Sequence, residues 1–361
     1  MKPNPLSILA ALTVVGLMAA AFFLLRPSQQ QLSEQISQLI NQQKSTLTKS
    51  DSDAVLVYTN LGDSFHHQFY IWTSIEQSRK FNPNLEIYLI LSKKAVSPEV
   101  RNKILQYRLR LFFYDEASDP IIDEFKSNFF IQGNMVPIDG NTNFVQYTTE
   151  RLIYIYVLMK NLGLKNVFHM ENDNLLYINL NELLKSFQAC KLNFGVPFAA
   201  KGQAVVSVLF IRDEQYLKDF IQYVISIFKM GRQKAQELLH TSYINDMTIT
   251  YAYFVDKRGD IAELPDKFYK RGENCIWDNA KIIIDACVLG QWFAGTHTNP
   301  SGHHYEDNRL VDPRQSQLVW KNSKFGFKEL YLRNAEYGEI RVVNMHIHSK
   351  ELEKYISKQN D

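Results

Sequence analysis

The chain has 361 residues, of which 45% are hydrophobic and 22% charged, as in a globular protein of one large domain or two small ones. Its 40 basic and 38 acidic residues nearly cancel, and no basic stripe interleaved with aromatic residues is present. Nucleic-acid binding therefore has no electrostatic support, and we expect no nucleic-acid partner.

The N-terminal region carries a membrane-anchor signal. Leu6 to Leu25 is an uncharged apolar run of about 20 residues, the length that crosses a bilayer as a helix. A cleaved signal peptide is the alternative, although its apolar core would be shorter. We expect residues 1–27 to form an uncleaved transmembrane anchor and residues 28–52 a polar stem. The rest of this single-pass protein would lie outside the cytosol, in a Golgi-type lumen if eukaryotic or at the inner membrane if bacterial.

Strands and helices alternate through the first half of the folded part. Apolar runs predict strands at 54–60, 85–91, 110–114 and 166–170, and helical spacing predicts helices at 65–81, 98–108 and 145–162. Alternation of elements of this length indicates a parallel sheet built from βα units.

The second half follows a different pattern. It contains a predicted strand at 205–211, helices at 214–230, at 234–255 with a break near Thr241, and at 281–293, and a polar loop at 295–313. Since no linker rich in proline or glycine interrupts the chain, we expect one domain over 53–350. Residues 53–178 would form its nucleotide-binding half, residues 179–350 its acceptor half, and residues 351–361 a polar tail.

Three cysteines are too few for a disulfide framework. Cys275 and Cys287 can pair if the domain lies in an oxidising compartment. Cys190 follows an apolar helix, so we expect it to be a buried small hydrophobe.

An acidic triplet ends the predicted strand at 166–170. Glu171-Asn172-Asp173 interrupts an apolar run that resumes at once. A buried parallel strand delivers such carboxylates to its C-terminal edge, where open α/β sheets bind ligands. Mg²⁺ and Mn²⁺ prefer oxygen ligands and keep open positions for a substrate diphosphate. The pairs Asp51/Asp53 and Glu351/Glu353 share the spacing but lie in polar stretches, which is typical of solvated surface charge.

A second polar motif lies near the C-terminus. His346, His348 and Lys350 alternate with other residues, so an extended segment projects all three to one face. A neutral imidazole is a suitable third ligand for a metal already held by carboxylates, and an ammonium group beside it would neutralise a diphosphate. The alternative is an edge strand with polar residues outward.

Together these motifs carry a resemblance. Tyr58-Thr59-Asn60 at the end of the first strand, the acidic triplet and the late His-x-His-Ser-Lys segment resemble metal-dependent GT-A glycosyltransferases, and the anchor and stem resemble their type II arrangement. The likeness runs from about Ala54 to Lys350. It implies a GT-A-like (Rossmann-like) α/β fold with a mixed, mostly parallel sheet flanked by helices. It also implies a nucleotide-sugar donor, with UDP the expected nucleotide, and Mn²⁺ or Mg²⁺ as the cofactor.

The resemblance assigns roles to the matching residues. It implies that Glu171 and Asp173 contact the metal or the ribose, that His346 or His348 is the third metal ligand, and that Lys350 contacts the diphosphate. Glu171 stands where the family has aspartate, and its longer side chain makes direct coordination less certain than for Asp173.

The same resemblance suggests a nucleoside site at Tyr58-Thr59-Asn60. The Tyr58 ring would stack on uracil and Asn60 would read its edge, whereas the alternative is that Tyr58 belongs to the core. Arg151, on the helix before the acidic strand, can reach a phosphate or pair with Glu150 or Asp173.

Two aspartates are candidate general bases for an acceptor hydroxyl. Asp246 begins a helix, where an acidic residue is commonly a cap. Asp285 lies in the apolar run 282–289, where desolvation should raise its pKa as a general base requires. A buried hydrogen bond to a helix end or an arginine is the alternative for Asp285.

We therefore expect a membrane-anchored glycosyltransferase acting on a glycan, lipid or protein acceptor. The first alternative is a nucleotidyltransferase, although the loop Asn60-Leu-Gly-Asp63 lacks the glycines of a phosphate loop. The second is a catalytically inactive, membrane-tethered protein that binds a sugar or nucleotide.

Overall fold

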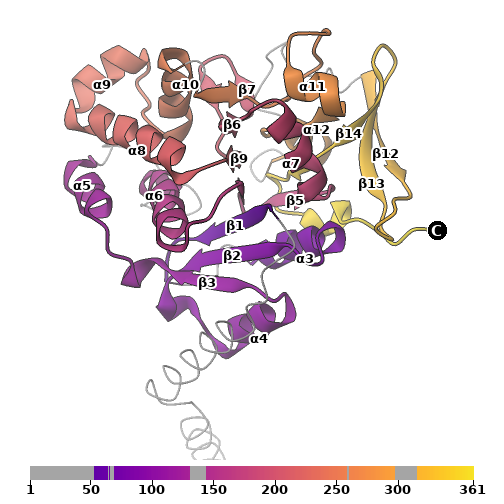
Figure 1. Cartoon of the computed structure of the whole chain (residues 1–361), viewed down its shortest axis with the longest axis horizontal. Coiled ribbons are helices and arrows are strands. Elements are labelled where there is room, and N and C mark those ends of the chain that lie inside the picture. Colours follow the sequence, from indigo (N-terminus) through magenta and orange to yellow (C-terminus); the bar gives the residue numbers. More distant parts are fainter. Residues whose placement is uncertain (1–52, 64, 66–68, 131–143, 258–259, 297–314) are drawn as a thin grey trace, which may run out of the picture. The chain divides into compact units, whose positions relative to one another are not determined.

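The computed structural model describes residues 53–63, 65, 69–130, 144–257, 260–296 and 315–361 (Figure 1). The chain divides into two compact units, Met1–Lys49 and Ser50–Asp361, and the described residues all belong to the second. The expected anchor and stem, residues 1–52, lie outside the described residues. Within the described ranges, no helix has the length and apolar character needed to cross a membrane.

A seven-stranded sheet forms the centre of the second unit, in the order β10-β6-β9-β4-β1-β2-β3. β9 is antiparallel to both of its neighbours, and the other adjacent strands pair in parallel. The expectation of a mixed, mostly parallel sheet is confirmed. The strands are β1 (Val55–Asn60), β2 (Glu86–Leu91), β3 (Arg110–Phe113), β4 (Val167–Met170), β6 (Phe194–Val196), β9 (Val208–Ile211) and β10 (Ile261–Glu263).

Helices cover both faces of this sheet (Figure 1). Val55 and Val57 of β1 share an apolar core with α6 and α8, whereas the Tyr58 side chain reaches the α3 side of the sheet. This alternation follows the two-residue period of a strand. Because both faces are covered, β1 is apolar for most of its length and buried throughout.

Most of the described helices correspond to predicted ones, but α5 and α11 were not predicted. They are α3 (Ile71–Phe81), α4 (Pro98–Gln106), α5 (Pro120–Asn128), α6 (Phe144–Leu162), α7 (Leu180–Ala189), α8 (Glu214–Lys229), α9 (Arg232–Leu239), α10 (Asp246–Asp256), α11 (Cys275–Ala280) and α12 (Val288–Ala294). Short 3₁₀ turns lie at Lys93–Ala95, Tyr114–Glu116 and Leu352–Tyr355.

The region after residue 280 differs from the expectation. The predicted helix at 281–293 is wrong in its first part, because Ile282–Ile283 forms β11, which pairs in parallel with β14 (Gly338–Val342). β14 continues an antiparallel meander with β13 (Glu329–Asn334) and β12 (Ser316–Lys321). A run of β-branched residues this short fits a strand or a buried helix equally well, and only the partner strand decides between them.

Three further features complete the described fold. A two-residue strand β8 (Gln203–Ala204) pairs with β7 (Phe198–Ala200). The strands of the large sheet come from both sides of residue 178, so the two expected halves share one sheet. Residues 351–361, expected as a polar tail, pack against α3: Leu352 is buried, and the Ser357 amide donates to Gln77 Oε1 at 2.9 Å.

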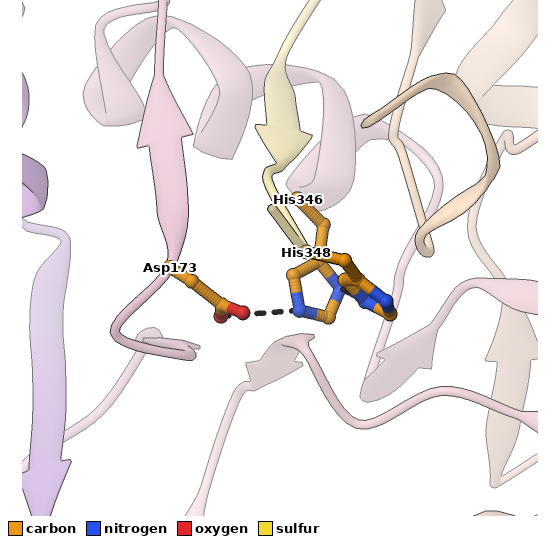
Figure 2. Close-up of side chains that lie close together, drawn as sticks. All are labelled: Asp173, His346 and His348. Carbon is orange, nitrogen blue, oxygen red and sulfur yellow. Dashed lines mark hydrogen bonds and ion pairs between the residues drawn. The ribbon is translucent and has the colours of Figure 1, made fainter. Parts of the chain in front are cut away.

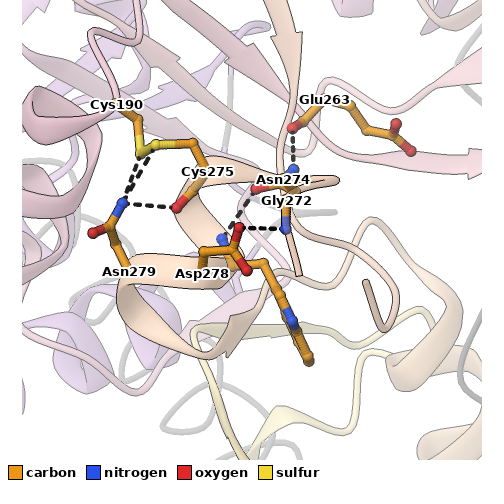
Figure 3. Close-up of a disulfide and its surroundings, with 8 residues drawn as sticks. Cys190, Glu263, Gly272, Asn274, Cys275, Asp278 and Asn279 are labelled. Carbon is orange, nitrogen blue, oxygen red and sulfur yellow. Dashed lines mark hydrogen bonds between the residues drawn. A yellow bond between two sulfur atoms is a disulfide. The ribbon is translucent and has the colours of Figure 1, made fainter. Parts of the chain in front are cut away.

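The disulfide pairing also differs from the expectation. Cys190, after α7, is bonded to Cys275 at the start of α11, with their Cα atoms 5.8 Å apart (Figure 3). Cys287 is a free, buried thiol. The proposed Cys275–Cys287 pair and the isolated buried Cys190 were therefore wrong. The fold places α7 beside α11, a contact between segments 85 residues apart that no local pattern reveals.

Candidate functional site

A short ladder joins the two polar motifs. β5 (Asn174–Leu176) directly follows the acidic triplet and pairs antiparallel with β15 (Asn344–His346). Its register sets His346 opposite Asn174, and the Ile347 amide donates to the Asp173 carbonyl at 2.8 Å. The ladder therefore brings the imidazole to the carboxylates that follow β4, at the carboxyl edge of the parallel strands.

Glu171, Asp173, His346 and Lys350 form an acidic–histidine cluster at this edge. His346 Nε2 lies 3.1 Å from Asp173 Oδ1 and 3.2 Å from Glu171 Oε2, and Figure 2 shows the contact with Asp173. Lys350 Nζ contacts the other oxygen of Asp173. The convergence that the sequence predicts for Asp173 and the late histidine is confirmed.

The hydrogen bonds of His346 define the charge that the cluster needs. Its Nδ1 lies 2.8 Å from the Ala286 carbonyl, which can only accept, so Nδ1 carries a proton. A neutral ring then directs the Nε2 lone pair at two carboxylates. His346 Nε2, Asp173 Oδ1 and Glu171 Oε2 are then three acceptors that face one another, so they require a cation between them. Without a metal that cation is a proton. Burial lowers the pKa of His346, but Asp173 and Glu171 outweigh burial and raise the pKa to about 9.

A divalent metal ion fits the side chains around His346. Ligand atoms of Asp173, His346 and His348 all lie within 4.8 Å of one another. The separations of 3.1 and 3.2 Å around His346 Nε2 match the roughly 3 Å between neighbouring ligands of an octahedral ion with bonds of about 2.1 Å. Carboxylate and imidazole ligands suit Mn²⁺ or Mg²⁺, and an ion held by few protein ligands keeps positions for a substrate.

Lys350 adds positive charge beside the cluster. Burial raises the pKa of Asp173, but His346 and Lys350 overcome this effect and hold the pKa well below its ordinary value. Lys350 Nζ also lies 5.1 Å from the centre of the Tyr70 ring. The ammonium group therefore lies at the wall of the site, where a phosphate group can approach it.

Arg151 links the cluster to a second carboxylate. Its guanidinium, on α6, contacts Glu171 Oε1 through Nη1 and Asp246 Oδ2 at 3.0 Å through Nη2. The expected pairing with Glu150 or Asp173 is therefore wrong. Glu171 uses one oxygen for Arg151 and turns the other toward His346. Burial raises the pKa of Asp246, and the Arg151 charge opposes that rise.

The first strand contributes less than expected. Tyr58 is fully buried, and its hydroxyl bonds Ser78 Oγ at 2.8 Å, so it belongs to the core and cannot stack on a nucleobase. Asn60 is 1% exposed and is absent from the cavity wall. Thr59 does line the cavity, and its carbonyl accepts a 2.8 Å hydrogen bond from Asn172 Nδ2. β1 therefore holds the triplet in place.

Asp285 does not fit a general base. One oxygen accepts from the Leu289 amide at 2.9 Å, and the other accepts from the amides of Gly290 at 2.8 Å and His346 at 3.0 Å. Both oxygens are committed to backbone donors, and the residue does not line the cavity. The alternative reading, a buried carboxylate bonded to a helix start, is confirmed.

The cluster lies at a cavity of about 320 Å³, at the small end of ligand pockets. Asn245 and Met247, beside the candidate Asp246, line it as well. Much of its wall was missed from the sequence: Leu61, Tyr70, Phe144, Val145, Tyr147, Thr148, Val205, Val206, Tyr243 and Cys287. Part of this wall had a signal, because Phe144, Thr148 and Arg151 recur at helical spacing on one face of α6. Val145 and Tyr147 also lie on α6, and the other missed residues lie outside helices and strands, where no periodicity marks them.

Comparisons with known proteins give distant likenesses. No family model matches the chain, and no curated protein matches it. Among solved structures it is similar to the PaToxG glycosyltransferase, at 12% identity and TM-score 0.38 over 63% of this chain and 78% of that chain. For mouse xyloside xylosyltransferase 1 the sequence identity is 10% and the TM-score 0.40, over 60% of this chain and 88% of that chain. For the galactosyltransferase LgtC, in complex with donor and acceptor sugar analogs, the sequence identity is 14% and the TM-score 0.34, over 59% of this chain and 74% of that chain.

A cytidylyltransferase from Leptospira borgpetersenii is also among the matches, at 8% identity and TM-score 0.32. Identities and TM-scores this low do not assign a family.

Proposed function

We propose that this chain is a metal-dependent glycosyltransferase that transfers a sugar from a nucleotide donor, with UDP the expected nucleotide, to a glycan, lipid or protein acceptor. The observation that carries the proposal is the convergence of Asp173, His346 and Lys350 at the carboxyl edge of parallel strands, beside a cavity. Ligands of open α/β sheets bind at that edge.

In this proposal Asp173 and His346 hold Mn²⁺ or Mg²⁺, and the Oε2 atom of Glu171 completes the protein side of the site. When bound, the ion would stabilise negative charge that develops on the departing nucleoside diphosphate. Lys350 contributes a second positive charge to the same phosphates, because its ammonium group lies beside Asp173 at the cavity wall.

Asp246 is the proposed base for the acceptor hydroxyl if the reaction inverts the anomeric centre. It lines the cavity, whereas Asp285 does not. Burial raises the pKa of Asp246, which improves a carboxylate as a proton acceptor. Arg151 donates to Oδ2 at 3.0 Å and the Met247 amide donates to Oδ1 at 3.1 Å, so both contacts fix the direction of the carboxylate. Unlike Asp285, Asp246 accepts only one backbone hydrogen bond from the described residues, and it lines the cavity.

The disulfide supports a location outside the cytosol. Disulfides persist in oxidising compartments, and Cys190 and Cys275 form one. We extend the proposal to a catalytic unit in a lumen or periplasm, with residues 1–27 as its membrane anchor and residues 28–52 as its stem.

A donor panel tests the proposal. We expect the full-length chain with Mn²⁺ to hydrolyse one sugar nucleotide slowly to free sugar and nucleoside diphosphate. Asp173→Asn should abolish this activity. Asp256→Asn, a carboxylate in an exposed position outside the cavity, should leave it intact.

The products separate the alternatives. Pyrophosphate released from a nucleoside triphosphate and a sugar phosphate would indicate a nucleotidyltransferase. Mn²⁺-dependent binding of UDP without turnover of any donor would indicate a binding protein and contradict the enzyme proposal.

A further inference from the structure

His346 and His348 alternate along the chain, but they face different parts of the site. His346 presents Nε2 to the carboxylates, whereas His348 Nε2 lies 3.3 Å from His346 Nδ1, on the opposite side of that ring. The two rings meet edge to face, with centroids 4.2 Å apart. In Figure 2, His346 lies between Asp173 and His348. Proximity alone would allow both rings to bind one ion, but the hydrogen bonds distinguish them.

The protons on the two rings follow from their partners. The Nδ1–H group of His346 points at the Ala286 carbonyl and at His348 Nε2. A hydrogen bond from this group to His348 requires a lone pair on His348 Nε2. Neutral His348 therefore carries its proton on Nδ1.

The Gln291 side chain contacts the other ring nitrogen of His348. Its amide nitrogen, Nε2, is the atom placed 2.9 Å from His348 Nδ1. An amide presents an oxygen and a nitrogen at equivalent positions, and the surrounding network decides which one faces a neighbour. The donation from His346 puts a proton on His348 Nδ1, and two donors cannot face each other. The amide must therefore be turned over, so that its oxygen takes the place of Nε2 and accepts from the ring. Gln291 is 1% exposed, so packing holds this arrangement.

Hydrogen bonds at the start of α12 hold Gln291 beside the two histidines. The Asp285 carboxylate accepts from the first-turn amides of Leu289 and Gly290 and from the His346 amide of β15. One carboxylate therefore fastens the helix that carries Gln291 to the strand that carries His346. Asp285, a candidate general base in the sequence, therefore acts by holding α12 and β15 together.

We propose that His348 and Gln291 are positioning residues for the metal site and that His348 is not a metal ligand. They form a chain from the Gln291 oxygen through His348 to His346 Nδ1, and this chain holds the His346 Nε2 lone pair toward the ion. The inference rests on the proposed metal-dependent function. Groups that fix a ligand's tautomer in this way typically contribute about 10–100-fold to metal affinity.

The test measures Mn²⁺ binding and coordination in the full-length chain. Pulsed electron paramagnetic resonance of bound Mn²⁺ counts the imidazole nitrogens on the ion, and we expect one. His346→Leu should remove that nitrogen signal. His348→Leu should keep it while weakening Mn²⁺ affinity by about 10–100-fold. His348→Gln supplies an amide oxygen near the position of Nε2 and should recover most of the affinity.

A matched pair probes Gln291 in the same assay. Gln291→Glu keeps an acceptor for His348 Nδ1–H and should retain metal affinity, whereas Gln291→Leu removes the acceptor and should weaken it. Thermal unfolding without metal identifies any variant that has lost its fold. The nitrogen count of the unaltered protein does not depend on the variants.

Each outcome bears on a defined claim. Two coordinated nitrogens in the unaltered protein, or equal losses in His348→Gln and His348→Leu, would overturn the inference and leave the proposed function standing. No Mn²⁺ binding by the unaltered protein would overturn both.

Discussion

Replacing Gly290 with alanine should destabilise the protein, although the same change inside most helices is stabilising by about 1 kcal/mol. A methyl carbon on Gly290 would lie 1.8 Å from the His346 carbonyl oxygen and 2.5 Å from its carbon. Since carbon atoms normally approach to about 3.5 Å, α12 would have to move by more than an ångström.

That movement disrupts the hydrogen bonds of Asp285. The carboxylate accepts from Gly290 at 2.8 Å and from His346 at 3.0 Å, and a hydrogen bond to a charged group contributes about 1.5–3 kcal/mol. Allowing for partial relaxation and for the helix preference of alanine, we expect the free energy of unfolding to fall by about 2–4 kcal/mol.

Chemical denaturation followed by circular dichroism measures this change. Gly338→Ala is the matched control, because nothing lies within 4 Å of its added carbon and only its φ of +78° opposes the change. The control should lose about 1–2 kcal/mol. Unchanged or increased stability in Gly290→Ala would refute the packing of α12 against β15.

Other predictions follow from the same contacts. Arg151→Met leaves the buried carboxylate of Asp246 and the partly buried carboxylate of Glu171 without their shared cation. It should cost about 3–5 kcal/mol in denaturation experiments; a neutral effect would show that the ion pairs are dispensable. Replacing Cys190 and Cys275 with serine opens a loop spanning 85 positions and should lower stability by about 4–5 kcal/mol on the chain-entropy relation. If reducing agent leaves the unfolding midpoint of the unaltered protein unchanged, the disulfide is not a stabilising link. Burial raises the pKa of Asp266 from its ordinary 3.8 to about 7, so its contribution to stability is present in acid and is lost as the pH rises toward 7. Asp266→Asn should make stability less dependent on pH between 4 and 7, and parallel profiles for the two proteins would contradict this assignment.

The sequence predicted those parts of the site that depend on strand periodicity. An apolar strand that ends in Glu171 and Asp173 must deliver them to the sheet edge, and the alternation of His346 with Met345 indicated an extended segment. The alternation did not distinguish the roles of His346 and His348, because those depend on which group faces each ring nitrogen. These partners come from the acidic triplet, from the Ala286 carbonyl before α12 and from Gln291 on α12, which meet only in the folded chain.

Other errors share a long-range cause. Tyr58 lies at the end of β1, where a ligand contact is plausible, but its place in the strand period directs it toward α3. The pairing of Cys190 with Cys275 requires α7 to lie beside α11. The missed strands β13 and β14 are different, because they did have a local signal: Leu330 and Leu332, and Ile340 and Val342, are buried at alternate positions as a half-covered strand predicts.

Titration calorimetry of UDP with the full-length chain, with and without Mn²⁺, tests the central claim most directly. The account predicts binding that requires Mn²⁺, is lost in Asp173→Asn and is kept in Asp256→Asn. UDP binding that is equally strong without metal, or that survives Asp173→Asn unchanged, would contradict it.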